Sequence, residues 1–222
     1  MDRRTFLKKL VTGAAGASAG LALAGCGGRA SLVRDPAPPY FGPRTGGPNA
    51  YAAGSAGPKS SGGAALARGP DAWVPQGSER KWRYIVLHHS ATDRGSATIF
   101  DRMHRSHGWD ELGYHFVIGN GEGAGNGAVE VGTRWPKQKH GAHCKVAGHP
   151  EYNDVGVGVC LVGNFDHYRP TDAQIDSCAR VVRFLQQRYD VPRSRIYGHG
   201  QLKPTHCPGR LFPYDEIFRR LG

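Results

Sequence analysis

Histidine and cysteine residues gather at two places in this sequence of 222 residues. His88 and His89 end an apolar run, and His199, His206 and Cys207 lie in a loop rich in glycine and proline. Imidazole and thiolate groups are ligands that zinc prefers, and three protein ligands with a fourth position left for water are typical of catalytic zinc sites. The alternative is that these are ordinary core or surface residues, which is common for a histidine at the end of a strand.

The elements that must position these residues follow from the hydrophobic pattern. Strands are predicted over residues 82–88, 114–118, 129–131, 155–162 and 195–197, and helices over residues 96–107, from 171 and over 214–221. The clearest helix begins with a capping box of Thr171 and Gln174. Adjacent residues of a strand point to opposite faces, so only one of His88 and His89 easily faces a given site. We expect a single α/β domain with a central mixed β-sheet flanked by helices.

Four blocks occur in an order that resembles a known enzyme family. They are residues 85–92 (IVLHHSAT), 113–118 (GYHFVI), 156–164 (GVGVCLVGN), and 198–199 (GH) with 205–209 (THCPG). Together they resemble the zinc-dependent N-acetylmuramoyl-L-alanine amidases of type 2, whose relatives include phage lysozyme-type amidases and animal peptidoglycan recognition proteins. The resemblance covers about residues 82–212. It implies the fold of that family and hydrolysis of the amide that joins the lactyl group of N-acetylmuramic acid to L-alanine of the peptidoglycan stem peptide.

The resemblance also implies a Zn²⁺ cofactor and its ligands. By position, the ligands fall on His88, His199 and Cys207. Cysteine as the third ligand, in place of aspartate, brings the chain nearer to the phage-type and recognition-protein branches than to the cytoplasmic recycling amidases. Zinc would make hydroxide available from bound water at neutral pH.

Two hydroxyl groups are implied as catalytic by the same resemblance. Tyr114 falls near the scissile carbonyl, and Thr205 takes the assisting position two residues before the metal cysteine. Both are candidates for stabilising the oxyanion. No HExxH helix supplies a glutamate base, so the proton path through Tyr114, His206 or His143 stays open. The neighbouring His115 is expected to point the other way and to order the core.

A substrate-facing loop is expected at residues 134–149, just before a predicted strand. Trp135, His140, His143 and several lysines lie in it, and by family position residues 140–143 (HGAH) form the groove wall. His143, Asn164 and Trp135 are predicted to contact the substrate. The alternative is a solvated basic loop. The expected substrate is peptidoglycan or its muropeptides.

The amino-terminal residues resemble a signal for export. The Arg-Arg-x-Phe-Leu-Lys order at residues 3–8 resembles a twin-arginine signal, and residues 1–25 are assigned to a signal peptide. Cys26 ends a sequence that resembles a lipoprotein cleavage box, and is predicted to carry a lipid anchor. A glycine after this cysteine favours the outer membrane if the host is Gram-negative, so we expect a periplasm-facing lipoprotein. Residues 26–79, rich in glycine and proline, are predicted to be a flexible linker, and residues 80–222 the zinc amidase domain.

Composition and charge limit the partners. The 33 glycines and 15 prolines suggest one globular domain beside a segment without a core. The formal net charge of +11 divides into +5 over residues 1–79 and +6 over residues 80–222. A domain at +6 is only moderately basic, which disfavours nucleic acid and suits an anionic cell-wall polymer or membrane surface. We expect a monomer without a nucleic-acid partner.

The five cysteines do not form a recognisable scaffold. They include no CxxC pair, which argues against a zinc ribbon or a disulfide framework. Cys144 and Cys160 could pair in an oxidising compartment. Cys160 and Cys178 fit buried free thiols equally well.

Two other functions compete with the amidase. One is a peptidoglycan receptor that keeps the fold without hydrolysis, a state that in this family usually goes with loss of the metal cysteine, whereas Cys207 is present. The other is a Cys-His peptidase with Cys207 as nucleophile. Pro208 disfavours the peptidase, because a residue before proline cannot begin a typical nucleophile-bearing helix.

Overall fold

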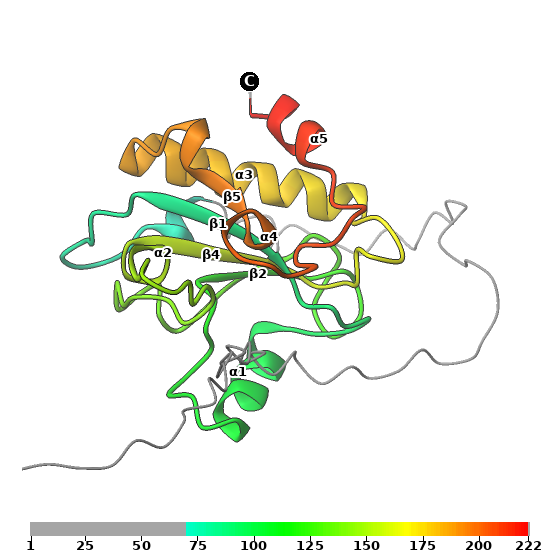
Figure 1. The fold of residues 1–222 in the computed structure, drawn as a ribbon, viewed down its shortest axis with the longest axis horizontal. Helices are drawn as coiled ribbons and strands as arrows, with labels where there is room; N and C mark the ends of the chain where they lie inside the picture. The colour runs from blue at the N-terminus through cyan, green and yellow to red at the C-terminus, as the bar shows by residue number, and fades with distance from the viewer. Residues whose placement is uncertain (1–69, 222) are drawn as a thin grey trace, which may run out of the picture. The chain divides into compact units, whose positions relative to one another are not determined.

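A five-stranded sheet forms the centre of the computed structural model, which describes residues 70–221. Its strand order is β3-β2-β4-β1-β5 (Figure 1). The strands are β1 (Tyr84–His89), β2 (Phe116–Ile118), β3 (Val129–Val131), β4 (Gly156–Leu161) and β5 (Ile196–Gly198). β1 pairs in parallel with β4 and β5, β4 pairs in parallel with β2, and β3 pairs antiparallel with β2. The predicted mixed sheet is confirmed, whereas Cys26 and the predicted signal peptide lie outside the described residues.

Helices flank both faces of this sheet. α3 (Asp172–Tyr189) and α5 (Tyr214–Arg219) lie on one side, and α1 (Ala97–Ser106) lies on the other (Figure 1). These three helices were predicted. Two helices of four residues, α2 (Glu151–Asp154) and α4 (His199–Leu202), were not predicted, and 3-10 helices cover Pro70–Trp73 and Arg193–Arg195. Among the described residues, no helix combines the length and the apolar character that a membrane span requires.

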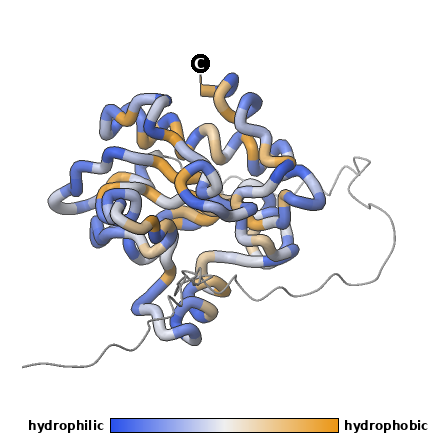
Figure 2. Tube along the Cα trace, viewed as in Figure 1, coloured by the Kyte–Doolittle hydropathy of each residue, from blue (hydrophilic) through white to orange (hydrophobic). Residues whose placement is uncertain are grey.

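The main core lies between the sheet and α3. Alternate residues of the two central strands are fully buried and meet the apolar side of α3. They are Ile85, Leu87, Val157, Val159 and Leu161 from the strands, and Ile175, Cys178, Val182 and Leu185 from the helix. Figure 2 shows hydrophobic residues concentrated along the central strands. The side chains on the opposite face of β1 and β4, such as His88, therefore lie outside this core.

The start of α3 is fixed by the predicted capping box. The Thr171 hydroxyl accepts from the Gln174 backbone N–H at 3.1 Å, and the Gln174 side-chain oxygen accepts from the Thr171 N–H at 3.2 Å. The Gln174 amide also donates to the backbone oxygens of Ile118 and Val162, at 3.2 and 2.8 Å. One side chain thus caps the helix and ties it to the ends of β2 and β4.

The domain begins earlier than the sequence predicted. Residues 70–79, assigned there to the linker, pack against it: Trp73 is 5% exposed and belongs to the main core. Trp135 donates its indole N–H to the backbone oxygen of Trp73 at 2.6 Å, and Glu79 forms an ion pair with Arg188 of α3. The structure therefore packs residues 70–79 with the domain and not with the predicted linker, because the large apolar surface of Trp73 is buried in the core.

Candidate metal and catalytic site

Parallel strands bring the two histidine-containing regions together. Leu87 of β1 pairs with Gly198 of β5, so the residues that follow, His88 and His199, lie at the same edge of the sheet. Cys207 lies in the loop after α4. One ligand atom from each of these three side chains lies within 4.8 Å of the others, and Cys207 Sγ is 3.6 Å from His88 Nδ1. The structure therefore gathers the three predicted ligands.

Strand alternation separates His88 from His89. His88 is fully buried on the face that carries the cluster. The His89 ring faces Phe165, and its Nδ1 accepts the Phe165 backbone N–H at 3.2 Å. His89 contributes to the cluster through its backbone instead, because its N–H donates to Cys207 Sγ at 3.4 Å.

The loop that carries Cys207 is held by its own backbone. The Gly200 N–H donates to the Cys207 carbonyl at 2.6 Å, and the Cys207 N–H donates to the Thr205 hydroxyl at 3.3 Å. A side chain at Gly200 would approach the Thr205 and Cys207 carbonyls to 2.8 and 2.9 Å, so glycine is needed for this approach. Thr205 is exposed beside the cluster, and its visible role is to support the Cys207 backbone.

The three donors have the chemistry of zinc ligands. Burial lowers the pKa of His88 well below its ordinary value, so its imidazole is neutral and carries a lone pair. Burial raises the pKa of the Cys207 thiol to about 12, so this thiol loses its proton to solvent only when a strong positive charge, such as a metal cation, stabilises the thiolate. Two imidazoles and one thiol match the soft ligand set that zinc prefers. The residues present therefore fit a zinc ion.

Tyr114 stands next to this cluster. Its half-buried ring lies 5.2 Å from the His88 ring, centroid to centroid. Burial raises the pKa of Tyr114 well above its ordinary value, with the nearby Cys160 and Cys207 thiols adding to the shift. The phenol is therefore neutral at physiological pH and can donate a hydrogen bond.

His143 lies behind the ligands and not in a substrate groove. It is 7% exposed, and both of its ring nitrogens contact protein atoms. Nδ1 is 3.1 Å from His88 Nε2, and Nε2 is 3.1 Å from the Gly156 carbonyl oxygen. The ring is enclosed between His88 and β4, which argues against the predicted contact of His143 with the substrate. Gly158 of β4, where a side chain would overlap this ring, was the sequence signal for its enclosed position.

Trp135 is also placed elsewhere than predicted. It is 1% exposed and packs in the main core against Trp82 and Phe116, with ring centroids 5.9 and 4.8 Å away. Its neighbour Arg134 is equally buried and donates to the backbone oxygens of Leu112 and His140. The first part of the predicted substrate loop therefore belongs to the core, which argues against a substrate contact by Trp135.

The remaining predicted residues lie around the cluster. Asn164 is nearly buried after β4, and its side-chain oxygen accepts the Asp166 N–H at 3.3 Å, so a substrate contact there stays a prediction. The His206 imidazole is 93% exposed, 3.8 Å from an Asp166 oxygen. His115 is buried, and its two nitrogens meet the Gly158 N–H and the Lys139 carbonyl, each at 3.0 Å.

No disulfide joins the cysteines within residues 70–221. Cys144, Cys160 and Cys178 are buried free thiols, and Cys207 is free and half-buried. The possible Cys144–Cys160 bridge is therefore not formed.

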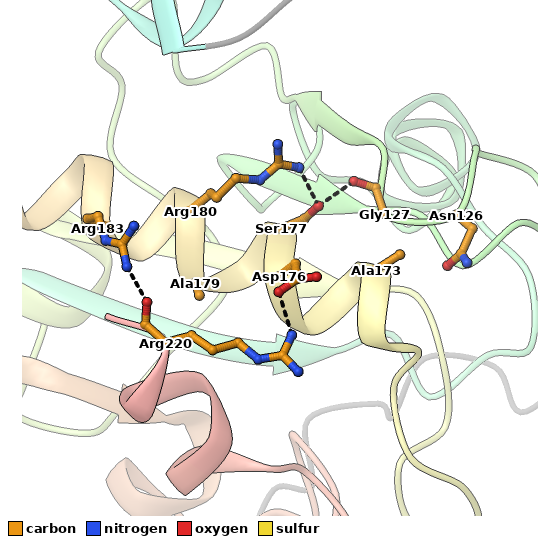
Figure 3. A pocket seen from close by; sticks show the side chains of 9 residues that line it. All are labelled: Asn126, Gly127, Ala173, Asp176, Ser177, Ala179, Arg180, Arg183 and Arg220. Atoms are coloured by element: carbon orange, nitrogen blue, oxygen red, sulfur yellow. Dashed lines mark hydrogen bonds and ion pairs between the residues drawn. The ribbon is translucent and has the colours of Figure 1, made fainter. Parts of the chain in front are cut away.

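A separate cavity of about 470 Å³ lies away from the cluster (Figure 3). It is bounded by α3, Arg220 at the end of α5, and the turn at Asn126 and Gly127. Arg220 in its wall is paired with Asp176 of α3 at 2.5 Å. Since α3 covers the face of the sheet opposite His88, this cavity is not part of the candidate site.

Known proteins are similar to this chain in sequence and in fold. The profile of the family described as N-acetylmuramoyl-L-alanine amidase (Amidase_2) matches residues 78–210. Peptidoglycan-recognition protein LB of Drosophila melanogaster is 29% identical over 141 residues, which are 58% of this chain and 56% of the relative. The chain thus spans about half the length of that relative.

Solved structures agree with this match. N-acetylmuramoyl-L-alanine amidase LysC from Clostridium intestinale URNW is 28% identical with a TM-score of 0.55, over 64% of this chain and 85% of that chain. Peptidoglycan recognition protein-LE, solved in complex with tracheal cytotoxin, a monomeric diaminopimelic acid-type peptidoglycan, is 23% identical with a TM-score of 0.50, over 67% of this chain and 90% of that chain. The latter likeness shows a shared fold.

Proposed function

The chain belongs to the N-acetylmuramoyl-L-alanine amidase family, and from that premise we propose that it hydrolyses the amide between the lactyl group of N-acetylmuramic acid and L-alanine of peptidoglycan stem peptides, with zinc as cofactor. The observation that carries the proposal is the convergence of His88, His199 and Cys207 within 4.8 Å. A catalytic set of three soft ligands beside a neutral phenol suits hydrolysis better than binding alone.

These three side chains would hold the zinc ion. Bound zinc supplies Lewis acidity and lowers the pKa of a coordinated water to about 7 in favourable sites. The protein contributes a buried, neutral His88 and a Cys207 sulfur held by the His89 backbone N–H. This hydrogen bond from the His89 N–H holds the Cys207 sulfur in position without a metal ion.

Tyr114 and Thr205 would serve the reacting amide. The neutral Tyr114 phenol, beside the His88 ring, donates to the oxygen that becomes negative as the carbonyl is attacked. The Thr205 hydroxyl uses a lone pair to accept the Cys207 N–H, so its hydrogen is still able to donate. Of the candidate proton carriers, His143 is the least suited, because both its nitrogens contact protein atoms, which leaves Tyr114 and the exposed His206.

Digestion of purified sacculi tests this function, with the products read by mass spectrometry. The wild-type chain should release stem peptides and leave the glycan intact, a chelator should abolish the release, and added zinc should restore it. Cys207→Ser should lose both bound zinc and activity. Stem peptides that stay attached in the presence of zinc-loaded protein would contradict the proposal.

The same experiment separates the competing functions. The peptidoglycan-recognition relatives make a receptor the second candidate, and a zinc-free chain that binds sacculi without cutting would support it. A thiol peptidase would cleave without metal. Burial raises the pKa of Cys207 to about 12, so the thiolate that such a peptidase needs is scarce at neutral pH.

We also propose that the enzyme acts at a membrane surface facing the periplasm. The support is sequence alone: the twin-arginine pattern and the cleavage box ending at Cys26. Cys26→Ala should release the protein from membranes into the soluble fraction. Unchanged membrane retention of this variant would rule out the lipid anchor.

A further inference from the structure

We propose that His143 is a positioning residue that decides which nitrogen of His88 is offered to a metal ion. The inference rests on the proposed function only in taking His88 as a ligand. It follows from a chain of three groups: the Gly156 carbonyl, the His143 ring and the His88 ring.

The direction of each hydrogen bond is set by the carbonyl. A carbonyl oxygen only accepts, so His143 Nε2, 3.1 Å away, must carry the hydrogen. In a neutral imidazole the other nitrogen then has a lone pair, so His143 Nδ1 accepts from His88 Nε2 at 3.1 Å. His88 Nε2 is therefore protonated and His88 Nδ1 carries the lone pair. That Nδ1 is the nitrogen that lies 3.6 Å from Cys207 Sγ.

Two glycines hold the His143 ring in this orientation. A side chain at Gly141 or at Gly158 would overlap the ring, so both positions must stay small for His143 to fit. The backbone is fixed as well, because the side-chain oxygen of Asn153 accepts the N–H groups of His143 and Cys144 at 2.9 and 2.8 Å. The ring is therefore packed on its faces, bonded at both nitrogens and anchored at its backbone.

Loss of His143 would remove the only acceptor that the described residues offer to His88 Nε2. The His88 ring could then turn or exchange its hydrogen between nitrogens, and the metal would meet the protonated nitrogen in part of the molecules. Groups that orient a metal ligand typically contribute about 10- to 100-fold to metal affinity. We expect His143→Leu to weaken zinc binding within that range.

Two measurements on the full chain test the proposal. The first is the zinc dissociation constant, from competition with a chromophoric chelator. The second is nitrogen NMR of the histidine rings in metal-free protein, which reports each tautomer. His143→Asn keeps an oxygen near the Nδ1 position, so it should recover most of the affinity lost in His143→Leu. His149→Leu, an exposed histidine of the same loop, is the matched control and should bind zinc as the wild type does.

The outcomes are distinct. The proposal predicts that metal-free wild type has hydrogen on Nε2 of both rings, and that His143→Leu frees His88 to populate the other tautomer. Gly158→Ala, which retains His143 but displaces its ring, should also weaken zinc binding. A His88 ring with hydrogen on Nδ1 in the wild type, or an unchanged tautomer and zinc affinity in His143→Leu, would overturn the proposal. Failure of wild-type protein to bind zinc would instead defeat the proposed function, and the tautomer measurement would still decide the role of His143.

Discussion

In the proposed mechanism, Tyr114 is the residue with the clearest role in the chemical step. Its neutral phenol lies beside His88 and outside the ligand set, so Tyr114→Phe removes one donor to the oxyanion and leaves the metal ligands intact. Loss of such a donor typically lowers kcat by about 10²- to 10³-fold. We expect that decrease with an unchanged zinc content, measured by stem-peptide release and by metal analysis of the same sample. An unaltered kcat would remove Tyr114 from the mechanism.

Buried histidines should make stability depend on pH. Burial lowers the pKa of His115 to about 3, whereas the unfolded chain binds this proton near pH 6.5. Between these values the unfolded state binds more protons, so the free energy of unfolding rises with pH, by about 1.4 kcal/mol per pH unit from this residue. The contribution is complete above about pH 6.5 and is lost as the pH falls towards 3.

Urea unfolding between pH 4 and pH 7, with a chelator present, measures this slope. In His115→Asn the slope should be smaller than in the wild type by up to about 1.4 kcal/mol per pH unit. Equal slopes would show that His115 titrates alike in the folded and unfolded chains.

Residue types and order predicted the cluster, but not the surroundings of each side chain. Strand alternation required a choice between His88 and His89. The family resemblance selected His88, and the structure places that residue in the cluster. Trp135 was misplaced because its position next to basic residues resembles a surface loop. Its burial depends on Trp73, more than sixty positions earlier, which local sequence does not reveal.

At the scale of elements, the capping box of α3 gives the sharpest prediction. Thr171→Ala removes the hydroxyl that accepts the Gln174 N–H, and such a cap contributes about 1 kcal/mol. We expect the free energy of unfolding to fall by that amount, measured by chemical denaturation. Thr98→Ala, at an exposed threonine inside α1, is the comparison, and an equal loss in both variants would argue against a specific capping effect.

Elements whose signals lie within one segment were predicted, and two helices too short to carry such a signal were not. α3 has its cap, its apolar spacing and its length within one segment. α2 and α4 have four residues each, too few for a hydrophobic period to show. α4 is nevertheless essential to the site, because it begins at His199 and is followed by the loop that returns to Cys207.

At the scale of the whole molecule, residues 70–79 extend the domain beyond its predicted start. Trp73→Ala in the full chain should lower the free energy of unfolding by about 3 kcal/mol, the usual cost of emptying a tryptophan site in a core. Trp109 is 42% exposed, and Trp109→Ala should cost less than about 1 kcal/mol. Equal losses in urea unfolding would show that Trp73 does not stabilise the fold.

The central claim, that this chain is a zinc amidase, is tested most directly by zinc titration of the chelator-stripped protein. The quantity to follow is the rate of stem-peptide release from a purified muropeptide as zinc is added. The account predicts a rate that starts near zero, rises in proportion to added zinc and levels off at one zinc per chain, since one cluster of His88, His199 and Cys207 binds it. Full activity in the stripped protein, or a zinc-saturated chain that releases no peptide, would contradict it.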